Sequence, residues 1–244
     1  MDYLVFRIYG PLASWGEAAV GPTRPTATYP GRSAVLGLLG AALGIRRDDN
    51  DALADLREAV GVAVKQFSPG VLVRDYHTAQ VPGHDAKAIR LTRQDELSGP
   101  REKLHTILSS REYRCDGYWT AAITIREGGA WTLEHLADAL RQPRFHLYLG
   151  RKSCPLAAPL EPRIVSAGGI REALAIEFPP LTALGHNEER RRLGIGAHVG
   201  YAWEGTAGDL SAQETRHPYD EPLDRGRWQF ASRPEYWHQT REES

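Results

Sequence analysis

The 244-residue sequence predicts an α+β fold, because strand-like and helix-like runs alternate along it in a recognisable order. Short runs rich in β-branched and aromatic residues predict strands, and longer runs with an apolar face predict helices. Apolar residues make up 41% and charged residues 25% of the chain, as in globular proteins with a substantial core. Up to residue 150 the expected order is strand, helix, two strands, a long insertion, strand, helix, strand. This βαββαβ order is that of the ferredoxin-like, RNA-recognition-motif-type fold.

The first half of this pattern begins with a strand at 2–9, DYLVFRIY, which Gly10-Pro11 ends. A long loop rich in glycine, proline and threonine then runs to Pro30. Ser33 is the expected N-cap of a buried helix, because the following AVLGLLGAALGI is apolar nearly all round. An acidic helix and two strands are expected next, at 51–60, 61–67 and 71–81.

The insertion at 87–114 differs in character, with seven basic and four acidic residues and a Ser98-Gly99-Pro100 turn at its middle. Extended sequence on both sides predicts a long basic hairpin or a partly ordered arm. A strand at 118–126 follows it. Thr132 then caps a helix that runs through Arg141, and a strand at 145–150 leads into a basic turn at 150–153.

The remainder of the chain is less regular and predicts a smaller, β-rich second domain at 156–244, after a first domain at 1–155. Strands are expected near 173–178, 199–205 and 226–232, and an arginine run occupies 190–192.

The net charge of −1 conceals a division along the chain. Residues 1–47 carry +3 and 61–160 carry +4, whereas 48–60 and 161–244 carry −4 each. Arginine supplies 26 of the 30 basic residues, and its planar guanidinium suits bidentate phosphate contacts and stacking. A GC-rich genome would raise the arginine content in the same way, so the positions of the arginines matter more than their number.

The sequence excludes several classes of protein. It contains no phosphate-binding glycine loop, no HExxH, no GxSxG and no CxxC pair, and its nine histidines lack ligand spacing. Two cysteines, Cys115 and Cys154, form neither a disulfide framework nor a zinc site. We therefore expect no metal, no cofactor and no metal-dependent or nucleotide-hydrolysing enzyme.

Membrane and secretory segments are not expected either. The longest apolar run is about a dozen residues, too short to span a bilayer. The N-terminus carries Asp2 and no basic region, unlike a signal peptide. We expect a soluble cytoplasmic protein.

Three features suit a polyanion instead. The first is the loop and helix start, where a helix N-terminus and an arginine could hold a phosphate while an aromatic ring stacks on a base. An ordinary capped helix beside an arginine is the alternative. The candidate residues are Ser14, Trp15, Arg24, Tyr29, Arg32 and Ser33.

The second feature is the basic arm, for which a solvated hairpin is the alternative because four acidic residues dilute its charge. The third is the turn Gly150-Arg151-Lys152-Ser153, whose cations and N–H groups could meet a phosphate, although such turns are common on surfaces.

Together these features resemble a known family. YLVFRIYGPLASWG with the helix GRSAVLGLLGAALGI, and later LYLGRKSCPLAAPL, are similar to the CasD family, the subunits that bind the 5′ handle of the guide RNA (crRNA) in type I-E CRISPR Cascade complexes. The resemblance covers the first 160 residues well and the remainder only loosely.

The resemblance implies a RAMP-superfamily protein with a ferredoxin-like palm and a long β-hairpin thumb at about 87–118. It also implies the crRNA 5′ handle, the CasC backbone subunit and the large CasA subunit as partners in antiviral defence. By position, Ser14, Trp15, Arg24, Arg32, Ser33, Arg151 and Lys152 would line the palm, and Arg90, Arg93, Lys103 and Arg111 would belong to the thumb.

The enzyme question stays open at this point, with RNA binding without cleavage preferred. A related subunit of type I-C systems cleaves repeat RNA without metal, using a tyrosine and an adjacent Lys-His pair. This chain has only Lys103-Leu104-His105, which a strand would place on one face about 7 Å apart. If the protein is a metal-independent endoribonuclease, Lys103 and His105 are the candidate catalytic residues.

Overall fold

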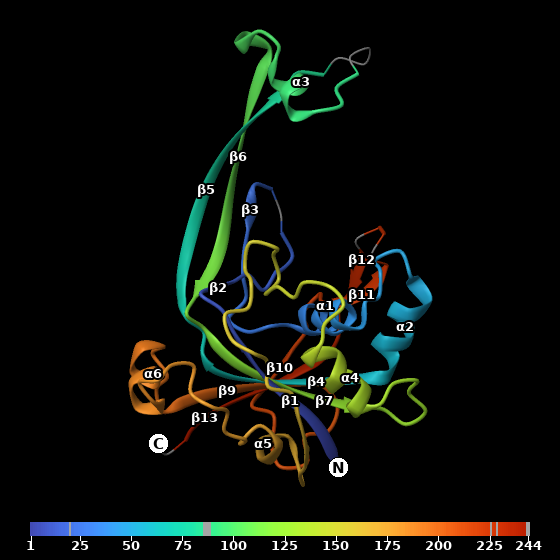
Figure 1. Ribbon diagram of the computed structural model, residues 1–244, viewed down its shortest axis with the longest axis vertical. Helices are drawn as coiled ribbons and strands as arrows, with labels where there is room; N and C mark the ends of the chain where they lie inside the picture. The colour runs from blue at the N-terminus through green and yellow to red at the C-terminus, as the bar shows by residue number, and fades with distance from the viewer. Residues whose placement is uncertain (20, 85–88, 225, 228, 243–244) are drawn as a thin grey trace.

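The computed structural model describes residues 1–19, 21–84, 89–224, 226–227 and 229–242, and shows a mixed α/β protein with antiparallel sheets (Figure 1). Its main sheet has seven strands in the order β10-β13-β9-β4-β7-β1-β8. These strands are β1 (Asp2–Tyr9), β4 (Val60–Ser68), β7 (Tyr118–Ile125), β8 (Arg163–Ser166), β9 (His198–Trp203), β10 (Glu214–Arg216) and β13 (Glu235–Arg241).

Apolar residues on both sides of the central strands explain their position in the middle of the sheet. On β1, the side chains of Leu4, Phe6 and Ile8 belong to one buried cluster and those of Tyr3 and Val5 to another. Successive residues of a strand point to opposite faces, so the run predicted at 2–9 supplies both cores.

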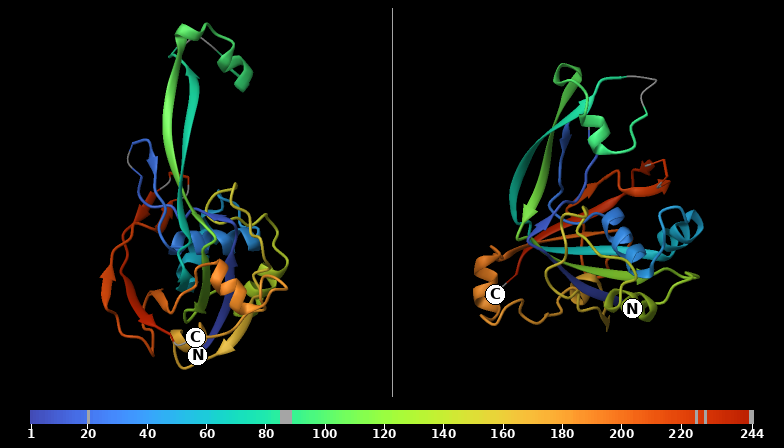
Figure 2. Two further views of the ribbon diagram at one scale, coloured as in Figure 1. Left: turned by 90° about the vertical axis from the view of Figure 1, so that its left-hand side faces the viewer. Right: turned by 45° about the horizontal axis from the view of Figure 1, so that its top comes forward.

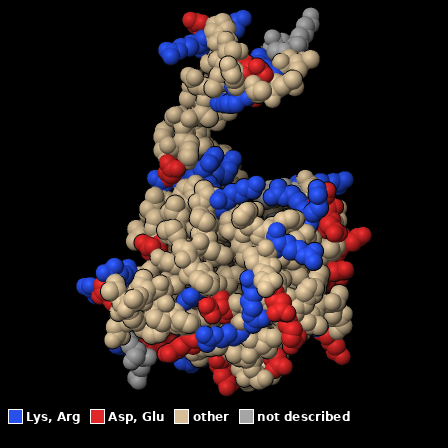
Figure 3. Space-filling view, viewed as in Figure 1, with Lys and Arg blue, Asp and Glu red and all other residues tan. Residues whose placement is uncertain are grey.

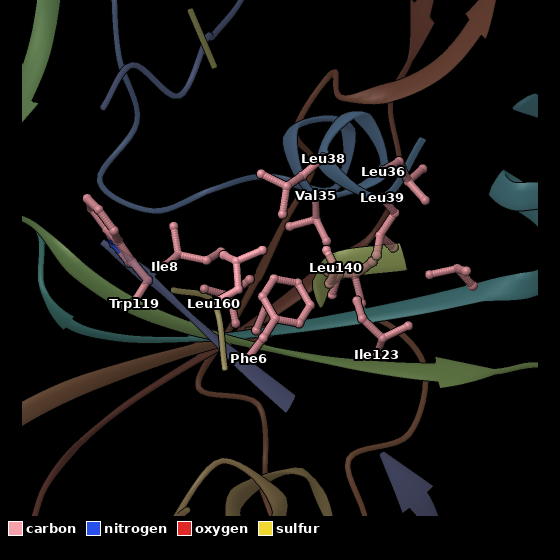
Figure 4. Close-up of a cluster of buried hydrophobic side chains, with 14 of the residues drawn as sticks. Phe6, Ile8, Val35, Leu36, Leu38, Leu39, Trp119, Ile123, Leu140 and Leu160 are labelled. Atoms are coloured by element: carbon pink, nitrogen blue, oxygen red, sulfur yellow. The ribbon is translucent and has the colours of Figure 1, made fainter. Parts of the chain in front are cut away.

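Two helices cover the first of these faces, α1 (Arg32–Leu43) and α4 (Leu133–Arg141), and α2 (Asn50–Ala59) lies beside α1. Leucines of α1 and Leu140 of α4 converge on Phe6 and Ile123 of the sheet (Figure 4). Thr132 caps α4 as predicted, accepting a hydrogen bond from His135 N at 3.2 Å.

The predicted N-cap of α1 is wrong by two residues. Gly31, in an extended conformation, is the N-cap, and Ser33 lies inside the first turn of the helix. The helix begins at Arg32, two residues before the apolar run, because Gly31 O accepts its first hydrogen bonds, from Ala34 N at 3.0 Å and from Val35 N at 3.2 Å.

Each of the helices α1 and α4 connects strands that have a third strand between them: β7 lies between β1 and β4, and β1 lies between β7 and β8. Helix α1 follows β1 and precedes β4, and helix α4 follows β7 and precedes β8. These four strands are neighbours in the sheet, in the order β8-β1-β7-β4. The predicted strand at 145–150 is wrong, because β8 takes the place beside β1. Phe145 N instead donates to Ala41 O at the end of α1, and Tyr148 makes only an isolated bridge to Pro155.

A long two-stranded hairpin projects from the sheet, as both views of Figure 2 show. It consists of β5 (Val71–Pro82) and β6 (Leu104–Cys115), with α3 (Arg93–Leu97) and the 3-10 turn η1 (Arg101–Lys103) near its tip. We call residues 71–115 the arm. The structure has a hairpin here with bounds other than the predicted 87–118, because β5, expected as a separate strand, is its first strand and only β6 falls inside that range. Residues 87–88 of the predicted range lie outside the described residues.

The C-terminal third adds β9, β13 and β10 to the same sheet, beyond β4. The strand predicted at 173–178 is wrong: α5 (Ile170–Ala173) ends there and irregular chain follows, with Ala173, Leu174 and Phe178 packed under the sheet. The arginine run lies in α6 (His186–Arg192), and β11 (Glu221–Asp224) pairs with β12 (Gln229–Ala231). The division into two domains near residue 155 stays a prediction. In the structure, the parts before and after this residue contribute strands to one sheet.

Within the described part of the chain, no helix combines the length and the apolar character that a membrane span requires.

Candidate nucleic-acid interface

The loop after β1 lies along the base of the arm. Its two short strands are β2 (Leu12–Ala13) and β3 (Thr23–Arg24). β2 pairs with β6 at Arg114 and Cys115, antiparallel, and β3 pairs with β6 at Ser110 and Arg111, parallel, while β5 pairs with β6 along its whole length. A small sheet therefore joins the N-terminal loop to the arm, and residues far apart in the sequence share one surface.

Two arginines meet on this small sheet. Arg24 of β3 and Arg111 of β6 are register partners, and both are exposed. Arg24 donates only to the carbonyls of Gly21 and Thr23, and among the described residues no carboxylate forms an ion pair with either arginine. Asp75, the antiparallel partner of Arg111, lies 2.6 Å from His77 Nε2 instead. Like charges directly opposite each other are unfavourable unless an anion lies between them.

The basic turn lies at the same end of β6. The Arg151 guanidinium lies 5.2 Å from the centre of the Tyr113 ring, and Tyr113 shares a face of β6 with Arg111 because it follows two residues later. Gly150 has a φ of 82°, and a Cβ there would lie 1.8 Å from Ser14 O. Only glycine lets the turn lie this close to the N-terminal loop, so the chain holds Arg151 and Lys152 beside the arm.

We call Arg24, Arg111, Arg151 and Lys152 the basic junction. Lysine and arginine side chains gather at the base of the arm and along the upper edge of the body, where the arm and the body enclose a hollow (Figure 3). A hollow bordered by cations, with arginines that lack carboxylate partners, is suited to a phosphate backbone.

Glu112 of β6 connects the N-terminal loop to the two strands of the arm. Its buried carboxylate accepts hydrogen bonds from Arg74 Nη2 at 2.7 Å and from Thr26 N at 3.4 Å, and its carbonyl accepts one from Ser14 Oγ at 3.1 Å. The hydrogen bond from Arg74 is the main reason why the pKa of Glu112 is lowered, so the carboxylate stays charged. The sequence predicts no structural role for Glu112, one of the four acidic residues that dilute the charge of the arm, because only the fold shows that it is buried on β6.

The structure places Ser14 and Trp15 inside the protein. Ser14 N donates to Leu149 O at 3.0 Å, and the Trp15 ring packs edge-on against Trp119 at 5.2 Å. Both residues are at most 3% exposed. They position the loop against the turn and the sheet rather than facing the hollow.

Tyr29 already has an aromatic partner. Its ring stacks on Trp237 at 5.1 Å, and its hydroxyl donates to Glu235 Oε1 at 2.5 Å. Burial, and then the neighbouring carboxylate of Glu235, raise the pKa of Tyr29 well above its usual range. The face expected to stack on a base is therefore covered by the C-terminal strand β13.

Arg32 is 2% exposed and fully engaged within the chain. It forms ion pairs with Glu221, at 2.6 Å, and with Glu204, and it donates to the carbonyls of Val60 and Arg57. A phosphate could reach this guanidinium only if those ion pairs opened.

The N-terminus of α1, expected to attract a phosphate, has an anion of its own nearby. A Cβ on Gly31 would lie 2.5 Å from Asp220 Oδ2, and Asp220 is itself paired with Arg233. Ser33, half-exposed in the first turn of α1, also lies in this region. The C-terminal segment thus occupies the position in which the sequence analysis expected a ligand.

The remaining candidates lie near the tip of the arm. Arg93 in α3 donates to Glu96 at 2.5 Å and to Gln80 O, and Arg90 precedes this helix. Lys103 ends η1, and His105 lies in β6. The expectation that a strand places Lys103 and His105 on one face is wrong, because Lys103 lies outside the strand. The arm holds both residues away from the basic junction (Figure 1).

No group of three or more His, Cys, Asp or Glu side chains within the described ranges is arranged to hold a metal ion.

Comparison with known proteins identifies similar chains. A family model described as "CRISPR-associated protein (Cas_Cas5)" matches residues 3–235. The "CRISPR system Cascade subunit CasD" of Escherichia coli strain K12 is 36% identical over 188 residues, which are 77% of this chain and 82% of that protein.

Two solved structures are similar along nearly the whole length. A chain of a "CRISPR RNA-guided surveillance complex" has a TM-score of 0.66 and 27% identity, covering 98% of this chain and 90% of its own. A structure titled "Crystal structure of Cas protein" has a TM-score of 0.59 at 24% identity, covering 98% and 94%, and supports the fold alone.

Proposed function

Since this chain belongs to the Cas5 family of CRISPR-associated proteins, we propose that it is a non-catalytic, RNA-binding subunit of a Cascade-type surveillance complex. In this proposal it grips the 5′ handle of the crRNA and caps the row of CasC backbone subunits, next to the large CasA subunit. The names of its relatives support the proposal that the chain is a subunit of such a complex, and the basic junction supports the proposal that it binds RNA.

We further propose that strands β8, β1, β7 and β4 with α1 and α4 form a ferredoxin-like palm, and that the arm is its thumb. The strand order β8-β1-β7-β4, with one helix after β1 and one after β7, supports this interpretation. Strands β9, β13 and β10 would then be a β-rich extension of the palm.

The pairing of Arg24 with Arg111 is the observation that carries the proposal. Two arginines in register, without a carboxylate partner in the part of the chain that the structure describes and with Arg151 and Lys152 nearby, can follow successive phosphates of a single strand. Ser14, Trp15, Tyr29, Arg32 and Ser33 would shape this surface from behind. Arg90, Arg93 and Lys103 would contact RNA or a neighbouring subunit from the tip of the arm.

The exposed apolar side chains of the arm support contacts with other subunits. Val71, Tyr76 and Ile107 are more than half exposed, at 69%, 64% and 52%. A two-stranded ribbon buries little of its own surface and is marginally stable alone. Packing against a neighbouring subunit or an RNA strand would cover these side chains.

The proposal predicts specific retention of the handle. In complexes assembled from co-expressed subunits, we expect a guide RNA with its natural 5′ handle to bind more tightly than one whose handle is replaced by unrelated sequence of equal length. Filter binding at several salt concentrations measures this difference, because backbone contacts alone weaken equally for both RNAs as salt rises. Equal affinity for the two guides would contradict handle recognition while leaving general RNA binding intact.

The alternative, a metal-independent endoribonuclease, makes a different prediction. We expect no discrete cleavage product when the purified protein is incubated with repeat RNA in EDTA, because Lys103 and His105 lie near the tip of the arm and away from the junction. Denaturing gel electrophoresis of labelled RNA is the measurement. A single product that His105→Ala abolishes and Arg101→Ala retains would establish the nuclease instead.

A further inference from the structure

A second surface, separate from the arm, is hollowed on the helix-covered side of the sheet. It is a groove of about 1450 Å³ between the outward face of α1, Leu53 of α2 and the segment 143–160. Lys152 is the only member of the basic junction that lines it among the residues described. The groove thus lies beside the proposed RNA surface and, among the described residues, shares only Lys152 with the basic junction.

The floor of the groove is aliphatic, and its small residues would let the backbone of a partner come close to it. Small residues of α1, Gly37, Gly40 and Ala41, line one side, and Leu156 and Leu160 line the other. Small side chains let another backbone come close, and exposed aliphatic surface favours a partner that buries it.

One wall of the groove is fixed by the main chain. Arg144 N donates to Ala42 O at 3.0 Å and Phe145 N to Ala41 O at 3.1 Å, so the segment lies firmly on the end of α1. Phe145 is nevertheless 47% exposed, and its ring stands at the edge of the groove. A preformed wall with an exposed aromatic ring lowers the conformational cost of binding.

The rim of the groove is basic. It is lined by four basic residues, Arg46, Arg47, Arg144 and Lys152, and, among the described residues, by one acidic residue, Asp48. Asp48 lies 3.3 Å from Arg46, and both side chains are 77% exposed. The excess positive charge around an aliphatic floor complements a partner with an apolar face bordered by carboxylates.

We propose that this groove binds an amphipathic, acidic α-helix of a partner protein. A three-turn helix, about 16 Å long and about 10 Å across, occupies about 1300 Å³, close to the volume of the groove. Apolar residues at i, i+3, i+4 and i+7 would cover the floor, and Asp or Glu beside them would face the rim. A single RNA strand fits less well, because bases stack on aromatic rings, and the rings of the groove (Phe145, His146 and Tyr148) are confined to one wall whereas the floor is aliphatic.

The test uses a fluorescein-labelled 15-residue peptide with leucine and alanine on one helical face and glutamate on either side. Binding to the full-length protein is followed by fluorescence anisotropy. A peptide of the same composition in scrambled order is the control for net charge, and a labelled oligouridine of equal length is the control for nucleic acid.

Two groove variants and one control variant complete the design. We expect Gly37→Trp, which fills the groove, and Arg144→Glu, which reverses rim charge, each to weaken binding of the ordered peptide about 10-fold or more. Arg191→Glu on α6, which changes an exposed arginine outside the groove, should leave it unchanged. Arg144→Glu should also bind a lysine version of the peptide better than the native protein does.

Handle-RNA binding by Gly37→Trp should equal that of the native protein, which shows that the variant folds and separates this inference from the RNA proposal. Ordered-peptide binding no tighter than scrambled-peptide binding would overturn the inference. Oligouridine binding that both groove variants abolish would overturn it as well, because the groove would then be a nucleic-acid site.

Discussion

Replacing Arg24 and Arg111 together by glutamate is expected to lower the affinity for handle RNA about 100-fold at 0.15 M salt, because two charge-assisted phosphate contacts of about 1.5 kcal/mol each are lost. The two arginines are register partners without carboxylate partners among the described residues, so the substitution breaks no ion pair within the described chain. Anisotropy of labelled handle RNA with the purified protein measures the loss, and guide occupancy of co-expressed complexes checks it in the assembly.

The salt dependence gives this prediction a second readout. The slope of log K against log salt should become shallower by about 1.4 in the double variant, since each phosphate contact with a single strand contributes about 0.7. Arg191→Glu with Arg192→Glu on α6 makes the same change in net charge away from the junction. An equal loss of affinity in this control would mean that only the overall charge matters, and it would contradict the assignment of Arg24 and Arg111.

Replacing Arg32 by alanine is expected to lower the free energy of unfolding by about 3 kcal/mol, because the largely buried carboxylates of Glu204 and Glu221 would keep only the longer ion pairs with Arg126, at 3.3 Å, and Arg57, at 3.7 Å. Glu204 and Glu221 are only 13% and 21% exposed and would lose their common partner. Urea denaturation followed by tryptophan fluorescence measures the change.

Arg46→Ala is the matched control, because the Arg46–Asp48 pair is solvent-exposed and its loss should cost about 0.5 kcal/mol or less. Combining Arg32→Met with Glu204→Gln and Glu221→Gln should recover part of the lost stability, since neither half-buried carboxylate charge then remains and the arginines that lose a partner, Arg57 and Arg126, are 23% and 49% exposed. If Arg32→Ala leaves the stability unchanged and abolishes RNA binding, Arg32 is a phosphate contact and the structural role assigned to it is wrong.

Elements whose signals lie within a few residues were predicted well. The strand at 2–9 and the Thr132-capped helix appear nearly where the sequence places them, because alternation and capping depend on neighbouring residues. The hairpin was also expected, although its first strand was assigned to the sheet, since an exposed ribbon and a sheet strand share the same period of two.

Two predicted strands failed for a common reason. The segments 145–150 and 173–178 have strand-like composition, but the first bonds to the end of α1 and the second packs its apolar residues under the sheet as irregular chain. Burial, rather than strand pairing, explains their apolar residues. Periodicity cannot separate these outcomes in runs of six residues.

The sequence alone determined the strand at 2–9, the helix capped by Thr132, the presence of a basic hairpin, and the motifs that link the chain to its family. It also placed arginines in the N-terminal loop, the arm and the turn at 150–153. Only the tertiary structure decided which of them face outward. Arg32 meets Glu204 and Glu221 from 172 and 189 positions away, whereas Arg24 and Arg111 meet each other on one surface. Helix and strand signals act between near neighbours, but the partner of a charged side chain is set by long-range packing, which sequence spacing does not record.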